Sequence, residues 1–334
     1  MARLWKRKCD VMEKREGFLW GALAGGLVIL YLLSSTDLII KEREMEVYPV
    51  SIVIGDTTDD YYVNFRKGAD QAADEYNVDV SFITLFDKGD AAQQIDLLRR
   101  EIDDGAKAVI LEPVNSAECA RLLGERSLGI PVIAAGAMVA SEPVKSWVSA
   151  DYFKQGQKLG NAIAENSSSR LPVYVLTERL ENGSTREMYD GLSSALSDAG
   201  YEVQVYEEEA EGTFQTVLDS AVHPGSGRVI IAALDPASTR KAAEIIGENP
   251  VYGIYVAALY GTGTTPALLN QMDKGMIKGL TVSNEFEQGY LCVENAVKTI
   301  KRESIPQQIL LESFYIEKED LRDPSIEKML YPVD

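Results

Sequence analysis

From position 50 onward, short apolar runs alternate with longer segments whose apolar positions recur every three or four residues. The short runs predict β-strands, and the longer segments predict amphipathic helices. The predicted strands are 50–54, 78–84, 108–111, 132–135, 147–149, 173–177, 202–206, 229–233, 253–257, 277–282 and 310–316. Regular alternation of this kind is typical of parallel sheets covered by helices on both faces. About eleven strands are too many for one small sheet, so we predict two doubly wound lobes.

Several predicted helices begin with capping residues. A short polar acceptor stands three residues before Glu or Gln at 90–93, 115–118 and 184–187, which is the spacing of a capping box. Proline follows a capping residue at 235–236 and 265–266, where it fits the first helical position. These signals predict helices that begin after Asp90, Asn115, Ser184, Asp235 and Thr265.

The first 47 residues have a different pattern. Residues 1–16 hold six basic and three acidic side chains, and residues 17–33 carry no charge. We therefore expect a cytoplasmic basic segment at 1–16, a transmembrane anchor at 17–36 and a charged stalk at 37–47. A cleaved signal peptide has the same order of basic and apolar segments. No clear Ala-x-Ala cleavage site follows the apolar run, but both alternatives remain open.

The charge of the chain excludes one class of partner. The formal net charge is −19, from 33 basic and 52 acidic residues. Residues 1–16 contribute +3, which leaves −22 for the remainder. Nucleic-acid binding needs a basic surface, so we expect no nucleic-acid partner. The acidic part lies beyond the predicted anchor, and we expect it to be extracytoplasmic.

Signatures of metal, cofactor and catalytic sites are missing from the sequence. The only histidine is His223, which excludes a multi-histidine metal site. Cys119 and Cys292 fall in helical patterns, where a lone cysteine is usually a small buried side chain. The segment GTGTTP at 261–266 lacks the lysine and the spacing of a phosphate-binding loop. We predict no cofactor, no metal and no enzymatic activity.

A series of motifs carries a family resemblance. These motifs are IVIGDTTDDYYVNFRKGADQAADEYNVDV, DDGAKAVILEPVNSAE, GIPVIAAGA, VSADYFKQGQKLGNAIAE, ENGSTREMYDGLSSALSDAG, RVIIAALDPASTRKAAEII and DKGMIKGLTVSNEFEQGYLCVENAVKTI. In this order they resemble the type I periplasmic binding proteins, in particular the ribose-binding-protein-like sugar- and solute-binding group. The ligand domain of that group is shared with lactose-repressor-type regulators. The resemblance covers about 47–317.

The resemblance implies an α/β fold of two doubly wound parallel-sheet lobes joined by three crossover strands, here preceded by the predicted transmembrane helix. It places the crossovers near 150–151, 283–284 and 312–314. The N-terminal lobe would then consist of 48–150 and 284–312, and the C-terminal lobe of 151–283 and 313–334. The DNA-reading helices of the repressor branch would precede the ligand domain, where this chain has the apolar segment and the stalk instead.

The loop GDTTDDYY at 55–62 follows the first predicted strand. In the family this loop supplies a polar contact and an aromatic pair to the ligand, and the resemblance implies these roles for Asp59, Tyr61 and Tyr62. A sugar needs polar groups at the ring edge and aromatic rings on its faces. Either tyrosine could instead pack only against the helix start. A calcium loop or a catalytic carboxylate pair are further readings, but the calcium-loop spacing is absent.

Four further positions are candidate ligand contacts. The resemblance places Arg186 where sugar-binding relatives hold the ligand, and its guanidinium can hydrogen-bond a hydroxyl pair or a carboxylate. Ser283 matches a crossover position with a polar contact. Asp235 either caps a helix or points into the cleft. Tyr260 is expected in the loop after the strand 253–257, and Glu112 is a possible acidic group at the rim.

The chain also departs from the family pattern. Relatives carry polar contacts at three places where this chain has apolar or small residues. These places are 135–137 (Ala-Gly-Ala), 257–259 (Ala-Ala-Leu) and 234 (Leu). A hexose or pentose bound in the usual way is therefore in doubt, and the ligand can be smaller, less hydroxylated or differently placed.

These observations predict a membrane-anchored extracytoplasmic protein that closes on a small polar, sugar-like ligand. Its partner would be an ABC permease for uptake, or a sensor histidine kinase that reads the closed form. The alternatives are a ligand-free interaction scaffold with the same fold and an enzyme on a similar fold.

Overall fold

The computed structural model describes residues 2–35, 46–55, 61–86, 89–125, 128–167, 171–181, 183–208, 213–221 and 227–332. The chain divides into two units, Met1–Glu46 and Val47–Asp334. The first contains helix α1, and the second contains the candidate site and every strand found in the described residues.

Helix α1 (Ala2–Ser35) includes the charged segment and the uncharged run 17–33. No helix in the described ranges is both long and apolar enough to cross a membrane. The structure therefore does not support the predicted anchor at 17–36.

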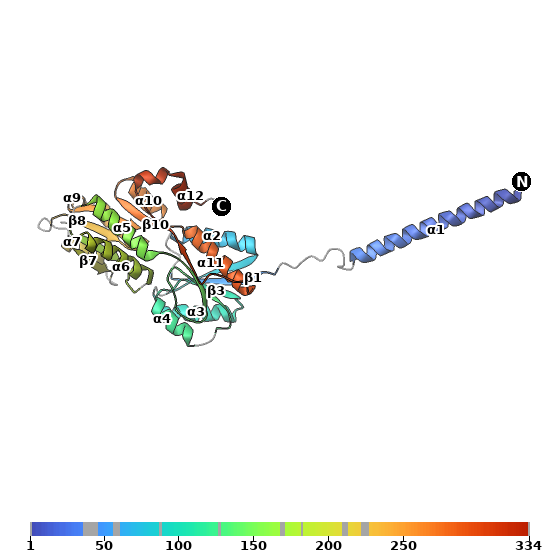
Figure 1. The fold of residues 1–334 in the computed structure, drawn as a ribbon, viewed down its shortest axis with the longest axis horizontal. Helices are drawn as coiled ribbons and strands as arrows, with labels where there is room; N and C mark the ends of the chain where they lie inside the picture. Colours follow the sequence, from blue (N-terminus) through green and yellow to red (C-terminus); the bar gives the residue numbers. More distant parts are fainter. Residues whose placement is uncertain are drawn as a thin grey trace. The chain divides into compact units, whose positions relative to one another are not determined.

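The N-lobe is built on a six-stranded sheet in the order β11-β5-β4-β3-β1-β2, in which every pair is parallel. Figure 1 shows its helices around this sheet. Its strands are β1 (Tyr48–Ile54), β2 (Val78–Thr84), β3 (Ala108–Leu111), β4 (Val132–Ala135), β5 (Val144–Ala150) and β11 (Gln308–Leu311). Its helices are α2 (Tyr61–Tyr76), α3 (Ala91–Asp103), α4 (Ser116–Gly124) and α11 (Glu285–Ile300).

The C-lobe repeats this plan in the order β12-β10-β9-β8-β6-β7, parallel except for the pair β10–β12. Its strands are β6 (Val173–Thr177), β7 (Val203–Glu207), β8 (Val229–Ala233), β9 (Val256–Thr262), β10 (Gly279–Ser283) and β12 (Ser313–Ile316). Its helices are α5 (Tyr152–Asn166), α6 (Gly183–Asp198), α7 (Thr213–Ala221), α8 (Pro236–Glu248), α9 (Tyr252–Tyr255), α10 (Pro266–Asp273), the 3-10 helix η1 (Lys318–Arg322) and α12 (Pro324–Leu330).

The predicted α/β fold with two parallel-sheet lobes is confirmed. Two of the predicted strands differ from the observed ones. Residues 252–255 form helix α9, and the strand β9 begins only at Val256. The predicted strand 310–316 is two strands, β11 and β12, because the chain passes from one sheet to the other at Glu312.

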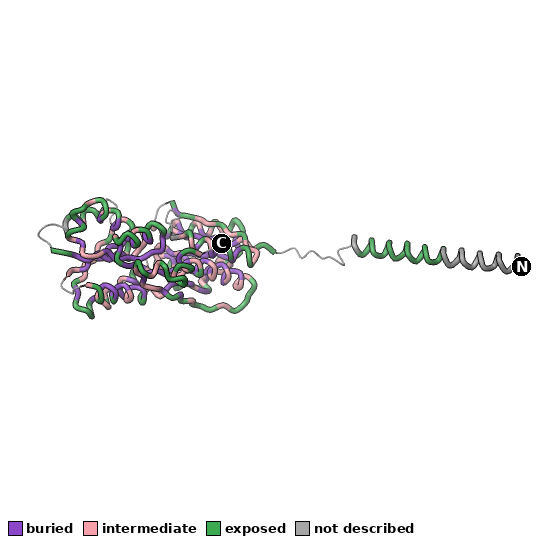
Figure 2. The backbone as a smooth tube through the Cα atoms, turned by 90° about the horizontal axis from the view of Figure 1, so that it is seen from above, coloured by how far each residue is buried: buried purple, intermediate pink, exposed green. Residues whose placement is uncertain are grey.

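Both faces of each sheet are buried. In β1, Ile52 and Ile54 pack into one apolar cluster with α2 and α11, while Val53 packs into another with α3 and α4. The C-lobe strand β8 divides its side chains in the same alternating way between two clusters. Figure 2 shows the buried stretches running through the interior of the folded unit. Strands buried on both faces must be apolar throughout, which is why they were visible in the sequence.

The chain crosses between the lobes three times, and two of the crossing residues also cap helices. Asp151 follows β5 and accepts a hydrogen bond from the backbone N–H of Lys154 at the start of α5, at 3.0 Å. Asn284 follows β10 and caps α11 through the N–H of Glu287, at 3.1 Å. The predicted caps at Asp90, Asn115, Asp235 and Thr265 are confirmed. The Ser184 cap was wrong, since α6 already begins at Gly183.

Each lobe contains one pair of helices in close backbone contact. In the C-lobe, a methyl group on Gly156 of α5 would overlap the carbonyl oxygen of Met188 in α6, and one on Gly191 would overlap that of Phe153. In the N-lobe, Gly68 of α2 and Gly289 of α11 meet the partner helix in the same reciprocal way. These helices can approach so closely only because the facing positions lack side chains.

We expect Gly156→Ala to destabilise the fold by about 3 kcal/mol, since backbone atoms cannot rotate away and the two helices must separate. Gly124→Ala is the matched control, because a methyl group there meets no atom within 4 Å. The control should be neutral or stabilise by up to about 1 kcal/mol. Equilibrium denaturation in urea measures both, and equal midpoints for the two variants would contradict the close packing.

Candidate ligand-binding cleft

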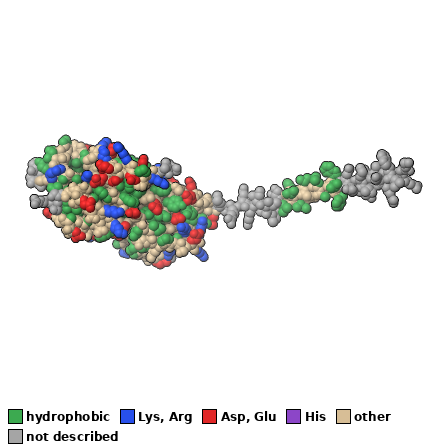
Figure 3. Space-filling view, turned by 45° about the horizontal axis from the view of Figure 1, so that its top comes forward, with side chains coloured by type: hydrophobic (Ala, Val, Ile, Leu, Met, Phe, Trp, Pro, Cys, Tyr) green, Lys and Arg blue, Asp and Glu red, His purple; other side chains and the backbone are tan. Residues whose placement is uncertain are grey.

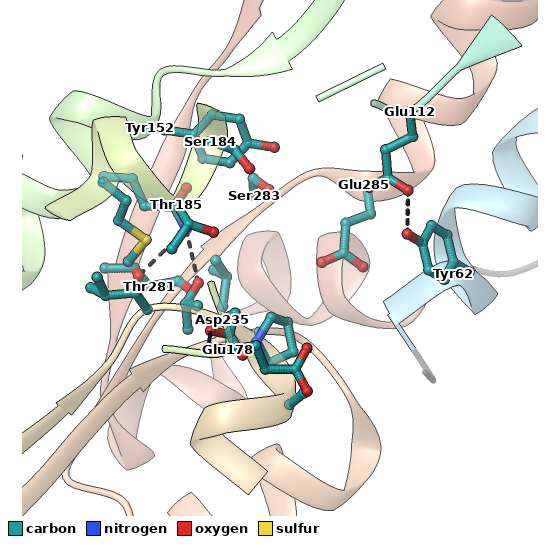
Figure 4. Close-up of a pocket in the computed structure, with 18 residues that line it drawn as sticks. Tyr62, Glu112, Tyr152, Glu178, Ser184, Thr185, Asp235, Thr281, Ser283 and Glu285 are labelled. Carbon is teal, nitrogen blue, oxygen red and sulfur yellow. Dashed lines mark hydrogen bonds between the residues drawn. The ribbon is translucent and has the colours of Figure 1, made fainter. Parts of the chain in front are cut away.

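A cavity of about 170 Å³ lies between the lobes at the carboxyl ends of the strands. One water molecule needs roughly 10–15 Å³ by this measure, so the cavity can hold a small organic molecule. The N-lobe supplies Tyr62 from the first turn of α2 and Glu112 directly after β3. Figure 4 shows these two on one side of the pocket and Asp235, Glu178 and Thr281 on the other.

Tyr62 and Glu112 form a pair. The phenol O–H of Tyr62 donates a short hydrogen bond to Oε2 of Glu112. The loop that carries Glu112 is fixed by the fully buried Gln94, whose amide donates to the Glu112 carbonyl at 2.7 Å and accepts from Val114 N–H at 3.1 Å. Desolvation raises the pKa of Glu112 from its ordinary value of 4.5 to about 7, although the Tyr62 hydrogen bond opposes the shift.

Asp235 has its oxygens engaged within the C-lobe. Its Oδ1 accepts from Ser238 N–H at 2.7 Å, and its Oδ2 accepts from Ser238 Oγ at 2.9 Å, Thr177 Oγ1 at 3.0 Å and Glu178 N–H at 2.9 Å. Burial raises the pKa of Asp235, and the backbone hydrogen bonds oppose the increase. Asp235 therefore caps α8 and also lines the cavity. The alternatives considered for it, cap or cleft residue, are not exclusive.

Gln155 of α5 is 3% exposed and has a fixed orientation. Its Nε2 donates to Oγ1 of Thr262 at 3.0 Å and, more weakly, to Oγ1 of Thr281 at 3.4 Å. Both threonine hydroxyls donate onward to backbone carbonyls, Thr262 to Thr281 at 2.9 Å and Thr281 to Gly261 at 3.4 Å. The hydroxyl oxygens must therefore act as acceptors, so the amide cannot be flipped. The Oε1 atom of Gln155 has no hydrogen-bond partner.

The cavity wall is rich in carboxylates. It includes Glu112, Glu178, Asp235 and Glu285, and none of the eighteen described lining residues is Lys, Arg or His. Lys241 lies outside the lining and pairs with Glu178 at 3.1 Å and with Glu208. Figure 3 shows acidic and basic side chains interspersed on the outer face in view. The charged side chains that line the cleft are thus all acidic, whereas the outer face in view carries both acidic and basic side chains.

The predicted site residues are only partly brought together. Tyr62, Asp235 and Ser283 line the cavity. Arg186 does not, and its exposed guanidinium pairs with Asp190 one helical turn later, at 3.6 Å. Tyr260 was expected in a loop, but it lies within β9 and is 1% exposed, because the strand starts and ends later than predicted.

The roles predicted for Asp59 and for the side chain of Tyr61 lie outside the described residues. The same holds for the possible calcium loop, 56–60. Elsewhere in the described chain no group of three or more His, Cys, Asp or Glu is arranged to hold a metal ion. Cys119 and Cys292 are free and fully buried, which confirms their expected packing role.

The lining residues that were not identified from the sequence include Tyr152, Gln155 and Glu285. Gln155 and Tyr152 lie within α5, and Glu285 is the first residue of α11, so each read as an ordinary helix position. The only available signal was their place just after a predicted crossover, where a helix start faces the cleft.

The lobes touch at the mouth of the cleft. A methyl group on Gly183 at the start of α6 would lie 2.9 Å from Ser116 Oγ of α4 and 3.3 Å from Cβ of Ala137. Gly89 of the N-lobe approaches the Arg179 guanidinium of the C-lobe closely enough to leave no room for a side chain. This is the arrangement of two lobes closed over a cavity.

Glu112 gives the ligand-free protein a pH-dependent stability. The Glu112 carboxyl binds its proton more tightly in the folded chain than in the unfolded chain. Its contribution to folding stability is therefore present below about pH 4.5 and is lost as the pH rises through about 7. A shift of this size corresponds to about 3 kcal/mol. We expect Glu112→Gln, which keeps an acceptor for Tyr62, to gain stability relative to the wild type between pH 5 and pH 8. Thermal unfolding across this range measures the gain.

The matched control is Glu125→Gln, which removes an exposed surface carboxylate of the same lobe. The difference in thermal stability between this variant and the wild type should stay nearly constant with pH. If the curves of melting temperature against pH run parallel for the wild type and Glu112→Gln, Glu112 is not desolvated.

A family profile described as a periplasmic binding protein domain matches residues 50–304. The chain is 28% identical over 272 residues to the ABC transporter periplasmic-binding protein YphF of Escherichia coli (strain K12), covering 78% of this chain and 77% of that protein.

Many solved structures share the fold, among them two that contain a bound sugar. One is an ABC transporter solute-binding protein from Agrobacterium vitis bound with alpha-D-tagatopyranose, with a TM-score of 0.77 and 18% identity over 86% of this chain and 100% of that chain. The other is a carbohydrate transporter solute-binding protein from Agrobacterium radiobacter in complex with D-arabinose, with a TM-score of 0.76 and 20% identity over 86% and 100%. At these identities the likeness concerns the fold alone.

Proposed function

The chain belongs to the periplasmic binding protein domain family, and from this premise we propose that it is an extracytoplasmic solute-binding protein for ABC-type uptake of a small polar, sugar-like molecule. The observation that carries the proposal is the cavity between two touching lobes, walled by polar groups from both. A ligand held by both lobes stabilises the closed state through its differential affinity, and closure is the signal that a membrane partner reads.

The cavity also favours a ligand-binding protein over a ligand-free scaffold. Gln155 and Glu112 both line this interior space, and polar side chains placed there cost free energy unless partners satisfy them. The relative from Escherichia coli is a periplasmic-binding protein of an ABC transporter, and the two solved structures hold alpha-D-tagatopyranose and D-arabinose.

We expect at least one compound from a panel of pentoses, hexoses, amino sugars, polyols, amino acids and divalent cations to raise the melting temperature of the full chain. A ligand at 100 times its dissociation constant stabilises the folded state by about 2.7 kcal/mol. Thermal unfolding identifies the hit and calorimetry measures its affinity. If only divalent cations raise the melting temperature, the ligand is a metal ion and not an organic solute. If no compound raises it, the result favours the ligand-free scaffold.

Closure itself is tested at Gly183. We expect Gly183→Leu to weaken binding of the hit at least tenfold, because the side chain meets Ser116 and Ala137 only when the lobes touch. The melting temperature without ligand should stay within about 1 °C of the wild type. Gly124→Leu, at an open position of α4, is the control and should bind normally. Unchanged affinity in Gly183→Leu would mean that binding does not need this closed arrangement.

A further inference from the structure

The residues after the last strand form a segment that is built into the C-lobe. The segment consists of η1 and α12 and continues to Pro332. The side chain of Leu330 is 2% exposed and belongs to an apolar cluster of the C-lobe, and further side chains of η1 and α12 pack against the same cluster. At the start of the segment, Lys318 forms an ion pair with Asp273 of α10 at 3.3 Å. We call residues 318–332 the strap.

The end of the strap contacts the other lobe. The Nδ2 atom of Asn64 in α2 donates a hydrogen bond to the carbonyl oxygen of Leu330 at 3.2 Å. The Nζ atom of Lys67 donates to the carbonyl oxygen of Pro332, also at 3.2 Å. Asn64 and Lys67 are three residues apart, so they lie on one face of α2. Figure 1 shows α12 beside α2. Leu330 thus joins the lobes, because its side chain is buried in one and its carbonyl group is bound by the other.

These carbonyl groups are available because α12 ends at Leu330. The last carbonyl groups of a helix have no partner within that helix. Here the carbonyl of Leu330, and that of Pro332 beyond the helix, accept hydrogen bonds from side chains of the N-lobe instead. The bond from the Lys67 ammonium group is charge-assisted, which makes it stronger than a bond between neutral groups.

Opening of the cleft would break this contact. Helix α2 belongs to the N-lobe, and its first turn carries Tyr62 on the cavity wall, two residues before Asn64. The strap moves with the C-lobe because Leu330 is buried there. Separation of the cavity walls therefore separates the donors from the carbonyl groups, unless Leu330 leaves its cluster and becomes exposed to water. The three crossovers are covalent and persist in an open form, whereas the strap contact does not.

We propose that the strap is a latch, whose carbonyl groups bind Asn64 and Lys67 and hold the lobes closed while the cleft is empty. This inference goes beyond the proposed function and does not depend on it, because a ligand-free scaffold with the same lobes would be held in the same way. The two hydrogen bonds stabilise the closed form with and without a ligand, so they raise the closed fraction in both cases. The strap thereby sets how closely closure follows occupancy of the cleft.

The distance between the lobes can be measured in the full chain, without any ligand, by pulsed electron spin resonance between two spin labels. Ala117→Cys on α4 and Asp190→Cys on α6 place the labels at exposed positions of the two lobes. Cys9→Ser removes one native cysteine, and the other two, Cys119 and Cys292, are buried. We expect the chain with an intact strap to show a population at the short distance of the closed form.

Variants on both sides of the contact test the latch. Asn64→Ala and Lys67→Met each remove one donor, and each should lower the ratio of closed to open molecules by about fivefold, as the loss of one hydrogen bond of modest net strength predicts. Leu330→Ala loosens the strap from the C-lobe without changing α2 and should lower the ratio in the same direction. Lys107→Met replaces an exposed lysine of the N-lobe and is the control for charge, so the ratio should stay unchanged.

Three results would overturn the inference. The first is the absence of a closed population in the labelled chain with an intact strap. The second is an unchanged ratio in both donor variants. The third is a loss in Lys107→Met as large as that in Lys67→Met, which would assign the effect to the overall charge and not to the strap. None of these results bears on the proposed function, which is tested separately by the response of thermal unfolding to the compound panel.

Discussion

Burial of both faces of both sheets is the constraint from which the site follows. Strands such as β3 and β8 are covered on each side by helices, so they carry only apolar side chains and no chemistry. Polar groups must then gather where the strands end. Since the strands of each sheet are largely parallel, these ends share one edge in each lobe, and the two edges meet at the cavity. The cleft is thus a product of the fold and not of any one motif.

Within that cleft, much of the polar chemistry is used to hold the protein itself. Asp235 caps α8, Gln94 fixes the loop of Glu112, and the threonines orient Gln155. Such internal bonding fixes the geometry of the wall before a ligand arrives. A donor that is used inside the protein is less available to the solute, so this internal bonding limits which wall groups a ligand can meet.

The sequence predicted the architecture well and the site in part, for physical reasons. Apolar runs identify strands buried on both faces. The family resemblance led to Tyr62 and Ser283, and the position after a predicted strand led to Asp235. Tyr260 was misplaced because the apolar residues of the short helix α9 resemble a strand start. Arg186 was assigned by resemblance, but an exposed helix position offers it Asp190 instead. Gln155 and Glu285 depend on three-dimensional placement after a crossover, which helical periodicity does not reveal.

The reciprocal glycine contact of the N-lobe joins α2 to α11, two helices separated by most of the chain, whereas its C-lobe counterpart joins the neighbouring helices α5 and α6. The edge strand β11 of the N-lobe also comes after the whole second sheet except β12. During synthesis, therefore, the lobe whose strands emerge first lacks a covering helix and an edge strand until nearly the entire polypeptide has been made. The C-lobe can pack its tightest helix pair long before that, so the order of translation is not the order in which the two halves become complete.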